Sequence, residues 1–166
     1  MSLEDLMIGR IVCELRETAR IGLGPGLPMR VVPFLSPHQK WLDLGQPRGQ
    51  GDAVDLAVVE ALEVSESGGA LVAKGAAVER IDAGTWIVAG MLKVENGGLQ
   101  MVKECTLPDQ CGGVSLIVTE LGVIGVSEIG FELLEISPGV CSDDVRMQVH
   151  ASLHVADDVR RIQLCA

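Results

Sequence analysis

The sequence predicts a single α/β domain whose mixed, largely parallel sheet is flanked by helices. Its 166 residues suit one domain with a sizeable core, and hydrophobic residues make up 48% of them. Helical and extended patterns alternate in the first half of the chain, while extended patterns dominate the second half. No linker or internal repeat interrupts this order, so we expect one domain over residues 1–166.

The N-terminal part predicts a helix, a strand, a turn and a second helix. Apolar residues recur at helical spacing over 3–18, and residues 19–23 have the composition of a strand. A glycine-proline turn follows, Gly22-Leu23-Gly24-Pro25-Gly26-Leu27-Pro28. Residues 28–35 predict a helix that Pro33 shortens or bends, because proline donates no backbone hydrogen bond. Residues 36–51 are polar and rich in turn formers.

The remaining two thirds predict mainly strands. Apolar runs at 55–62 and 70–73 flank Ser65-Glu66-Ser67-Gly68-Gly69, which predicts two strands joined by a turn. Runs at 85–91 and 99–103 flank Asn96-Gly97, the strongest short hairpin signal in the chain. We expect three further strands at 114–118, 122–126 and 131–136, and a helix over 143–150 that Ser142 caps.

The charge balance restricts the classes of partner. The formal net charge is −10, and no cluster of lysine and arginine interrupts it, which argues against nucleic acid. No apolar run reaches the roughly eighteen residues that cross a bilayer, and Glu4 and Asp5 stand where a secretory signal needs basic residues. We therefore expect a soluble, cytoplasmic protein. An anionic ligand would need backbone N–H groups, a helix N-terminus or basic residues of another subunit.

The cysteines and histidines predict neither a disulfide framework nor a metal site. Five cysteines are an odd number, without Cys-x-x-Cys spacing, so reduced thiols are the simplest interpretation. His150 and His154, with Cys165 as a distant third ligand, have a spacing that could bind metal on one helix. Exposure explains them better, because His150 ends a helical pattern and His154 begins an alternating one. We expect no metal.

The glycine-proline turn is the first candidate binding site. Gly22, Gly24 and Gly26 allow positive φ and bring backbone N–H groups near a ligand, and Pro28 can open a helix at its first position. This is the sequence form of a strand-loop-helix anion site. The alternative is a tight connection between strand and helix that binds nothing.

Four further segments carry a resemblance that covers nearly the whole chain. The strand-turn-strand over 55–71 comes first, and Lys103-Glu104-Cys105-Thr106-Leu107-Pro108 follows it. Val118-Thr119-Glu120-Leu121-Gly122-Val123 and Glu135-Ile136-Ser137-Pro138-Gly139-Val140 come later, in the same order. Together with the glycine turn, these segments resemble family I coenzyme A transferases of the β-subunit type, as in the 3-oxoacid CoA-transferases.

The resemblance implies a fold, a reaction and a partner. The fold is that of the NagB/RpiA/CoA transferase-like superfamily, and the reaction moves CoA between an acyl-CoA and a 3-oxo acid or another carboxylate. A glutamate attacks the thioester, forms a mixed anhydride and then carries CoA as a glutamyl thioester. The resemblance implies no tightly bound cofactor, a coenzyme A thioester as substrate, and an α-type partner subunit. Its ligand-binding positions are Gly22, Gly24, Gly26, Pro28 and Gly75.

The chain departs from the family at the chemistry. The nucleophilic glutamate precedes the strand at 55–62 in the family, but no glutamate lies between Glu17 and Glu60 here, and internal deletions are apparent near 37–52 and 73–77. Gly75 is the expected remnant of a glycine-rich segment whose N–H contacts the thioester oxygen. Glu95-Asn96-Gly97 has the letters of the nucleophile motif, but a hairpin turn explains it.

No residue is therefore assigned as catalytic. Glu60 and Glu63 fit a polar strand edge or strand end, and Cys105 fits a small buried thiol, since a reactive thiolate needs positive charge nearby.

Three functions remain open. The chain is a CoA-transferase subunit that uses a relocated acid or an acid of its α-type partner, or it is a non-catalytic relative, a pseudoenzyme that serves as an oligomeric or partner-binding subunit. A third function, isomerase-like chemistry on a phosphorylated sugar, rests on the anion loop alone. Deleting part of a core leaves apolar surface and unpaired strand edges, so we expect a homo-oligomer or a complex with a partner.

Overall fold

The structure is a computed structural model that describes residues 1–46, 52–79, 81–94 and 98–165. In chain order its helices and strands are α1 (Leu3–Leu15), β1 (Arg20–Leu23), the 3₁₀ helix η1 (Leu27–Phe34), β2 (Lys40–Asp43), β3 (Asp52–Ser65), β4 (Ala70–Val72), β5 (Ile81–Ala89), β6 (Gln100–Val102), β7 (Val114–Val118), β8 (Gly122–Ser127), β9 (Gly130–Ile136), α2 (Ser142–Arg146) and β10 (Leu153–Arg161).

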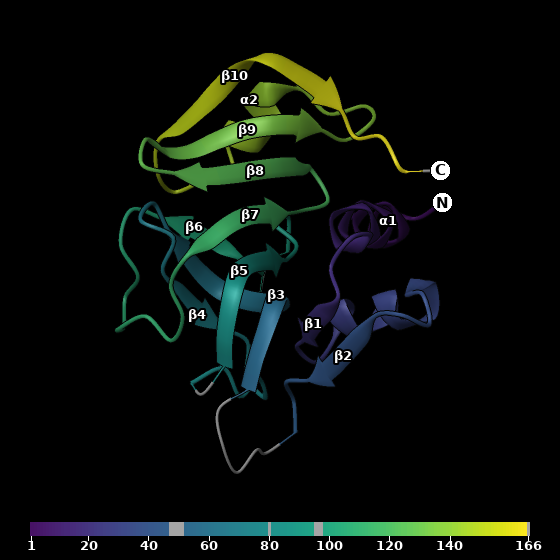
Figure 1. Cartoon of the computed structure of the whole chain (residues 1–166). Coiled ribbons are helices and arrows are strands. Elements are labelled where there is room, and N and C mark those ends of the chain that lie inside the picture. Colours follow the sequence, from purple (N-terminus) through teal and green to yellow (C-terminus); the bar gives the residue numbers. More distant parts are fainter. Residues whose placement is uncertain (47–51, 80, 95–97, 166) are drawn as a thin grey trace.

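The main path of the sheet has the order β10-β9-β8-β7-β5-β3-β1-β2 (Figure 1). Strands β2, β1, β3, β5 and β7 are parallel, whereas β8 runs antiparallel to β7 and β9. The chain then crosses over through α2, so that β10 lies parallel to β9. The predicted α/β domain with a mixed, largely parallel sheet is therefore confirmed.

Helix α1 begins and ends at side-chain hydrogen bonds. The Ser2 hydroxyl accepts the Asp5 N–H at 3.0 Å, and the Asp5 carboxylate accepts the Ser2 N–H at 3.0 Å, which forms a capping box. At the other end the Gln39 amide donates to the carbonyls of Leu15 and Thr18. The helix predicted over 3–18 is present, but it stops at Leu15, whose carbonyl accepts both the Gln39 amide and the Thr18 N–H.

Helix η1 packs beside α1 on one face of the sheet. Pro28 stands in its first turn and Pro33 in its interior, where the missing N–H favours a short 3₁₀ segment over an α-helix. Apolar side chains of both helices and of β1 and β3 form one core, which includes Met7, Ile11 and Val31. A second core on the opposite face lies between the sheet, β4, β6 and α2.

Strand β3 takes part in two sheets. Its first part pairs with β1 and β5, and its C-terminal end pairs with β4 in antiparallel and with β6 in parallel orientation. The hairpin predicted at residues 65–69 is therefore confirmed. The hairpin predicted at Asn96-Gly97 is wrong, because β5 and β6 each pair with β3 rather than with each other. Residues 95–97 themselves lie outside the described residues.

Two further details correct the sequence analysis. Strand β2 lies inside the segment expected to be only turns, where it pairs with β1 as an edge strand. Helix α2 ends at Arg146 and is capped at Cys141, whose N–H donates to the Asp144 carboxylate at 2.8 Å, so the predicted cap at Ser142 is wrong by one residue.

The expectation of reduced thiols is wrong for one cysteine pair. Cys13 of α1 and Cys165 of the C-terminal segment form a disulfide, with Cα atoms 5.5 Å apart. The N- and C-terminal ends of the chain lie on the same side of the molecule (Figure 1). An odd number of cysteines did not preclude this bond, because Cys105, Cys111 and Cys141 remain free.

A largely buried ion pair joins α1 to the far part of the sheet. The Arg10 guanidinium donates from Nε and Nη2 to both carboxylate oxygens of Glu135 in β9, at 2.9 and 2.8 Å. Burial alone lowers the pKa of Arg10, but the hydrogen bonds to Glu135 and Glu14 outweigh it, so that this pKa is raised.

In the part of the chain that the structure describes, no helix has the length and apolar character needed to cross a membrane.

Candidate functional site

The carboxyl ends of the parallel strands form the edge where the candidate site lies. Strand β1 lies between β2 and β3 in the sheet. The chain therefore passes from β1 to β2 on one side of β1, and then to β3 on the other side of β1. In open α/β sheets, ligands bind outside the carboxyl ends of the strands at such a reversal of strand order. The glycine turn predicted from the sequence begins in the last two residues of β1 and continues past its end.

The residues of the glycine turn have different structural roles. Gly22 lies inside β1, where a Cβ would come 3.2 Å from Leu44 Cδ1. Gly24 donates its N–H to the Val58 carbonyl at 2.9 Å. Gly26 alone of the three adopts a positive φ, +88°, and it is exposed. Pro28 is buried in the first turn of η1. The predicted permissive backbone is thus confined to Gly26.

The structure brings the second predicted loop to this turn. Gly75 has φ +100° and is exposed, and a Cβ on it would lie 3.6 Å from Pro25 Cγ. A Cβ on Gly45, just after β2, would lie 3.7 Å from both the Gly75 carbonyl oxygen and Pro25 Cβ. The Ala77 N–H donates to the Leu44 carbonyl at 2.6 Å and holds these loops together. Three loops separated in sequence therefore meet in one place.

Glu60 projects toward the same turn. It stands in the central strand β3, level with Ala89 at the end of β5, and is half-buried, so of the two expected positions it has the one near a strand end and not the one at a sheet edge. A Cβ on Gly26 would collide with its carboxylate oxygen Oε2. Burial raises the pKa of the Glu60 carboxyl, an N–H from Leu27 partly opposes this, and the charge of Glu4 adds to the rise. The only sequence signal for this side chain was an acid within an apolar strand.

Glu63 has a different environment. Its carboxylate accepts the Thr106 N–H at 2.8 Å and the Thr106 hydroxyl at 2.7 Å. It thereby ties the segment over 103–108 to β3 near the end of that strand. This position agrees with the predicted strand-end role, and its contacts are structural.

A second carboxylate, from the segment over 118–123, shapes the neighbouring loop. Glu120 follows β7 and is 2% exposed. It accepts the Leu92 N–H on both oxygens at 2.8 Å and the Lys93 N–H at 2.7 Å. These bonds fix the loop after β5, which lines the cleft beside Glu60. A buried carboxylate with backbone partners of this kind stabilises the wall of a site rather than reacting in it.

The cysteine and histidine candidates lie apart from this chemistry. Burial and the charge of Asp109 raise the pKa of Cys105 to about 11, so its thiol stays protonated at neutral pH. The side chain is partly exposed and not buried as expected. Lys103 is exposed. His150 forms a single bridge with Val102, whereas His154 belongs to β10, and both are exposed as expected. Glu95 lies outside the described residues.

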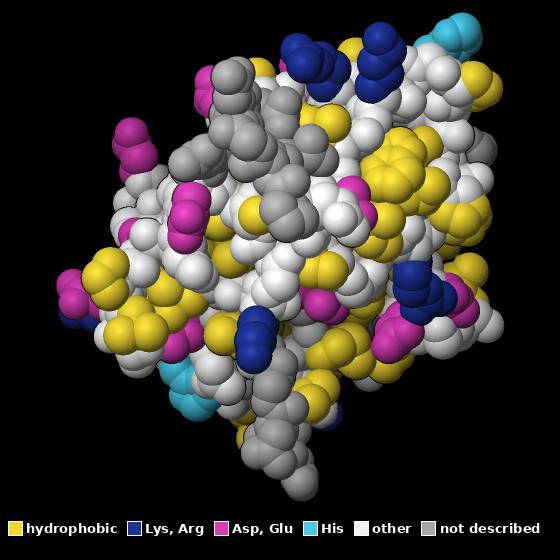
Figure 2. All heavy atoms as spheres, turned by 90° about the horizontal axis from the view of Figure 1, so that it is seen from below, with side chains coloured by type: hydrophobic (Ala, Val, Ile, Leu, Met, Phe, Trp, Pro, Cys, Tyr) yellow, Lys and Arg dark blue, Asp and Glu magenta, His cyan; other side chains and the backbone are white. Residues whose placement is uncertain are grey.

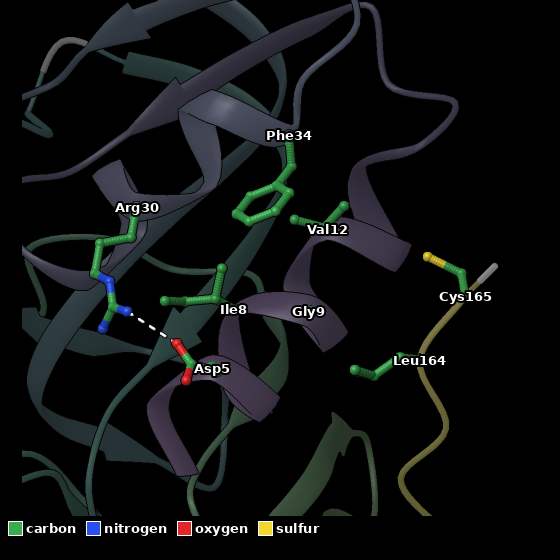
Figure 3. A pocket seen from close by; sticks show the side chains of 8 residues that line it. All are labelled: Asp5, Ile8, Gly9, Val12, Arg30, Phe34, Leu164 and Cys165. Atoms are coloured by element: carbon green, nitrogen blue, oxygen red, sulfur yellow. Dashed lines mark hydrogen bonds and ion pairs between the residues drawn. The ribbon is translucent and has the colours of Figure 1, made fainter. Parts of the chain in front are cut away.

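A separate cleft lies on the outer side of α1 and holds about 400 Å³ (Figure 3). Ile8, Val12 and Phe34 line it, and Leu164 of the C-terminal segment borders it. Its two charged groups, Asp5 and Arg30, form an ion pair at 3.1 Å. This cleft is therefore apolar with its charges already paired, and its described lining contains no group suited to acyl chemistry.

The face of the molecule shown in Figure 2 has few clustered lysine and arginine side chains. In Figure 2, lysine and arginine side chains are scattered among hydrophobic and acidic ones. A phosphorylated ligand approaching the described part of this face would find no continuous basic area, in keeping with a net charge of −10.

No protein-family model matches the sequence. The β subunit of the acetate CoA-transferase of Haemophilus influenzae is 28% identical over 126 residues, which represent 69% of this chain and 56% of that subunit. The chain thus spans little more than half the length of the curated relative it matches.

Solved structures show where the fold recurs. A variant of the decarboxylase AibA/AibB superposes with a TM-score of 0.76 at 12% identity, over 99% of this chain and 90% of that one. The acyl-CoA transferase YdiF of Escherichia coli O157:H7 gives 0.75 at 16% identity, over 98% and 44%; it is also known as a thioester complex with CoA. Glutaconate CoA-transferase of Acidaminococcus fermentans gives 0.71 at 10% identity, over 100% and 90%.

Proposed function

We propose, from the premise that this chain has the fold of a β-type subunit of the family I CoA-transferases, that it is such a subunit in an enzyme acting on CoA thioesters. The reaction is transfer of CoA between an acyl-CoA and a 3-oxo acid or another carboxylate. One observation carries the proposal: the loops with Pro25, Gly45 and Gly75 meet at the reversal of strand order, beside a half-buried carboxylate. YdiF, which shares this fold, is known with a CoA thioester.

Each predicted ligand-binding residue has a place in the proposal. Gly26 and Gly75 contact the thioester through their exposed backbone. Both adopt a positive φ, which glycine allows and which exposes the backbone on the ligand side of each loop. Gly22, Gly24 and Pro28 are buried and position the turn without touching the ligand. CoA is a substrate here, not a tightly bound cofactor.

A partner subunit completes the site in this proposal. The curated relative is named a β subunit, and AibA/AibB has a two-part name. A chain of net charge −10 needs cations from elsewhere to hold the phosphates of CoA. We infer an α-type subunit that supplies them, a cytoplasmic location, and a domain over residues 1–166 whose lost segments lie near 37–52 and 73–77.

The first test is CoA exchange by the chain together with the subunit that co-purifies with it. Acetyl-CoA or succinyl-CoA is offered with acetoacetate, and the new thioester is measured by chromatography. We expect exchange, and Gly75→Ala should lower it about a hundredfold, because an alanine strained at φ +100° displaces the backbone contact. Absence of both exchange and a CoA-sized adduct on the protein would contradict the proposal.

Gly113→Ala is the matched control. Gly113 also has a positive φ, +81°, and a Cβ there meets nothing within 4 Å. Both alanine variants carry similar backbone strain, but Gly113 lies away from the candidate site. Its exchange rate should stay at the wild-type value.

A second candidate function is a non-catalytic subunit, and one contact favours it. The carboxylate of Glu60 already accepts the Leu27 N–H beside the glycine turn, so the chain supplies its own anion there. This version predicts assembly with a partner or with itself, but no turnover. Light scattering that shows a monomer, with no partner retained on purification, would exclude it.

A further inference from the structure

Glu60 continues a row of buried apolar side chains on one face of β3. Leu56 and Val58 precede it at the spacing of two that keeps residues on one face of a strand, and both lie in the core under α1 and η1. The next residue in the row is a carboxylate. It stands level with Ala89 of β5, the last residue of that strand, and so reaches the carboxyl edge of the parallel strands.

The contacts of the carboxylate hold it without neutralising it. It accepts one backbone N–H, from Leu27 at the start of η1, and it lies against Gly26. The negative charge of Glu4 repels the Glu60 carboxylate and raises the pKa of Glu60. Burial raises the pKa of Glu60 more than this N–H lowers it. The structural carboxylate of Glu120 is held by backbone N–H groups on both oxygens, whereas Glu60 has one such donor and a raised pKa, which is typical of a carboxylate at a functional site.

A cleft of about 250 Å³ opens next to this side chain. Its other described lining residues are apolar or glycine, among them Ala73, Gly90, Met91 and Leu99. Glu60 is thus the ionisable group among the described residues that line it. An apolar cleft with one perturbed carboxylate suits the acyl chain of a thioester, with its carbonyl carbon facing the acid.

We propose that Glu60 is the carboxylate that accepts the acyl group and then CoA, a role that rests on the proposed function. Its oxygen attacks the thioester carbonyl carbon, a C–O bond forms, and the C–S bond breaks with its electron pair leaving on the CoA thiolate. The thiolate attacks the Glu60 carbonyl carbon, the C–O bond to the acyl group breaks, and the first carboxylate leaves with that pair. The acceptor carboxylate repeats both steps in reverse, so no proton or further reactant is consumed.

The competing role for Glu60 is a purely structural cap on η1. The variant Glu60→Gln separates the two, because the amide oxygen still accepts the Leu27 N–H but cannot form an anhydride. A carboxyl whose pKa is raised on folding stabilises the fold below its unfolded pKa, and this contribution is lost as pH rises through the folded pKa. At neutral pH the glutamine variant should therefore be at least as stable as the wild type. A purely structural cap is preserved in this variant, so in that case exchange should persist at the wild-type rate.

The experiment is peptide mass spectrometry on the chain with its co-purified subunit, incubated with acetyl-CoA or succinyl-CoA. Trypsin cleavage after Arg48 and Lys74 isolates a peptide that contains Glu60, Glu63 and Glu66. Borohydride reduces a glutamyl thioester to an alcohol and marks the residue that carried CoA. We expect the mark on Glu60 and a loss of exchange of at least about a thousandfold in Glu60→Gln. Glu63→Gln, whose carboxylate is bound to Thr106, is the matched control and should keep both signals.

The outcomes distinguish this inference from the proposed function. Exchange that persists in Glu60→Gln, or a mark on another residue or on the partner, overturns the role of Glu60 and leaves the CoA-transferase function standing. A glutamine variant that has lost stability together with exchange shows that exchange was lost through the fold, and this result also overturns that role. No exchange and no mark in the wild type overturns the proposed function together with it.

Discussion

Replacing Arg10 with methionine should destabilise the fold by about 3–5 kcal/mol, because it leaves the carboxylate of Glu135 buried without its partner. The two side chains are 12% and 11% exposed, and the guanidinium binds both carboxylate oxygens. Urea unfolding measures the change. The double variant Arg10→Met/Glu135→Leu should recover most of the loss, since a well-packed apolar pair of similar size replaces an ion pair at little cost.

Arg30→Met is the matched control for this prediction. Arg30 also pairs with residues of the α1 region, Glu4 and Asp5, but its side chain is 46% exposed. Exposed ion pairs contribute about 0–1 kcal/mol, so the change in unfolding free energy should be small. Equal losses in the two variants would show that burial does not set the strength of these pairs.

Reduction of the Cys13–Cys165 disulfide should lower the unfolding free energy by about 2–4 kcal/mol. The bond joins residues 152 apart, and its removal gives the unfolded chain the freedom of an open loop of that length. Unfolding by urea with and without reductant measures the difference. Under non-reducing denaturing conditions, we expect three titratable thiols, those of Cys105, Cys111 and Cys141.

Cys141→Ser serves as the control for the disulfide, because Cys141 is exposed and free. Its unfolding should respond to reductant as the wild type does, whereas Cys13→Ser should show no response. Five titratable thiols in the oxidised protein, or equal stability with and without reductant, would refute the bond.

The sequence was a good guide to those elements whose pattern is local. The helix over the first residues, the strands at 114–118, 122–126 and 131–136, and the turn at residues 65–69 all appear where the periodicity or the turn residues indicate them. Strand β2 was missed because it is a short edge strand with exposed Lys40 and Trp41, so it lacks a buried side that would show as alternation.

The errors arose where distant pairing outweighs local preference. Asn96-Gly97 suggested a hairpin, but β6 pairs with the end of β3 in parallel, an arrangement that no two-residue turn signal describes. The same limit applies to the site. Each of Gly26, Glu60 and Gly75 was visible in the sequence, whereas their meeting depends on where β1 and β3 lie in the sheet. The disulfide is a further case, since its cysteines lie at opposite ends of the described chain.

The shared strand β3 also sets the order in which the protein can be assembled during synthesis. The first part of β3 can pair with β1, and its end with β4, as soon as about the first seventy residues are outside the ribosome. Its remaining edges stay unpaired until β5 and β6 have been made. Glu60 lies between these two parts of the strand, so its surroundings are completed only after Val102 has emerged. A nascent chain stalled before that residue would expose a long, largely apolar strand at an open edge, which makes this interval the one most in need of a chaperone or a partner.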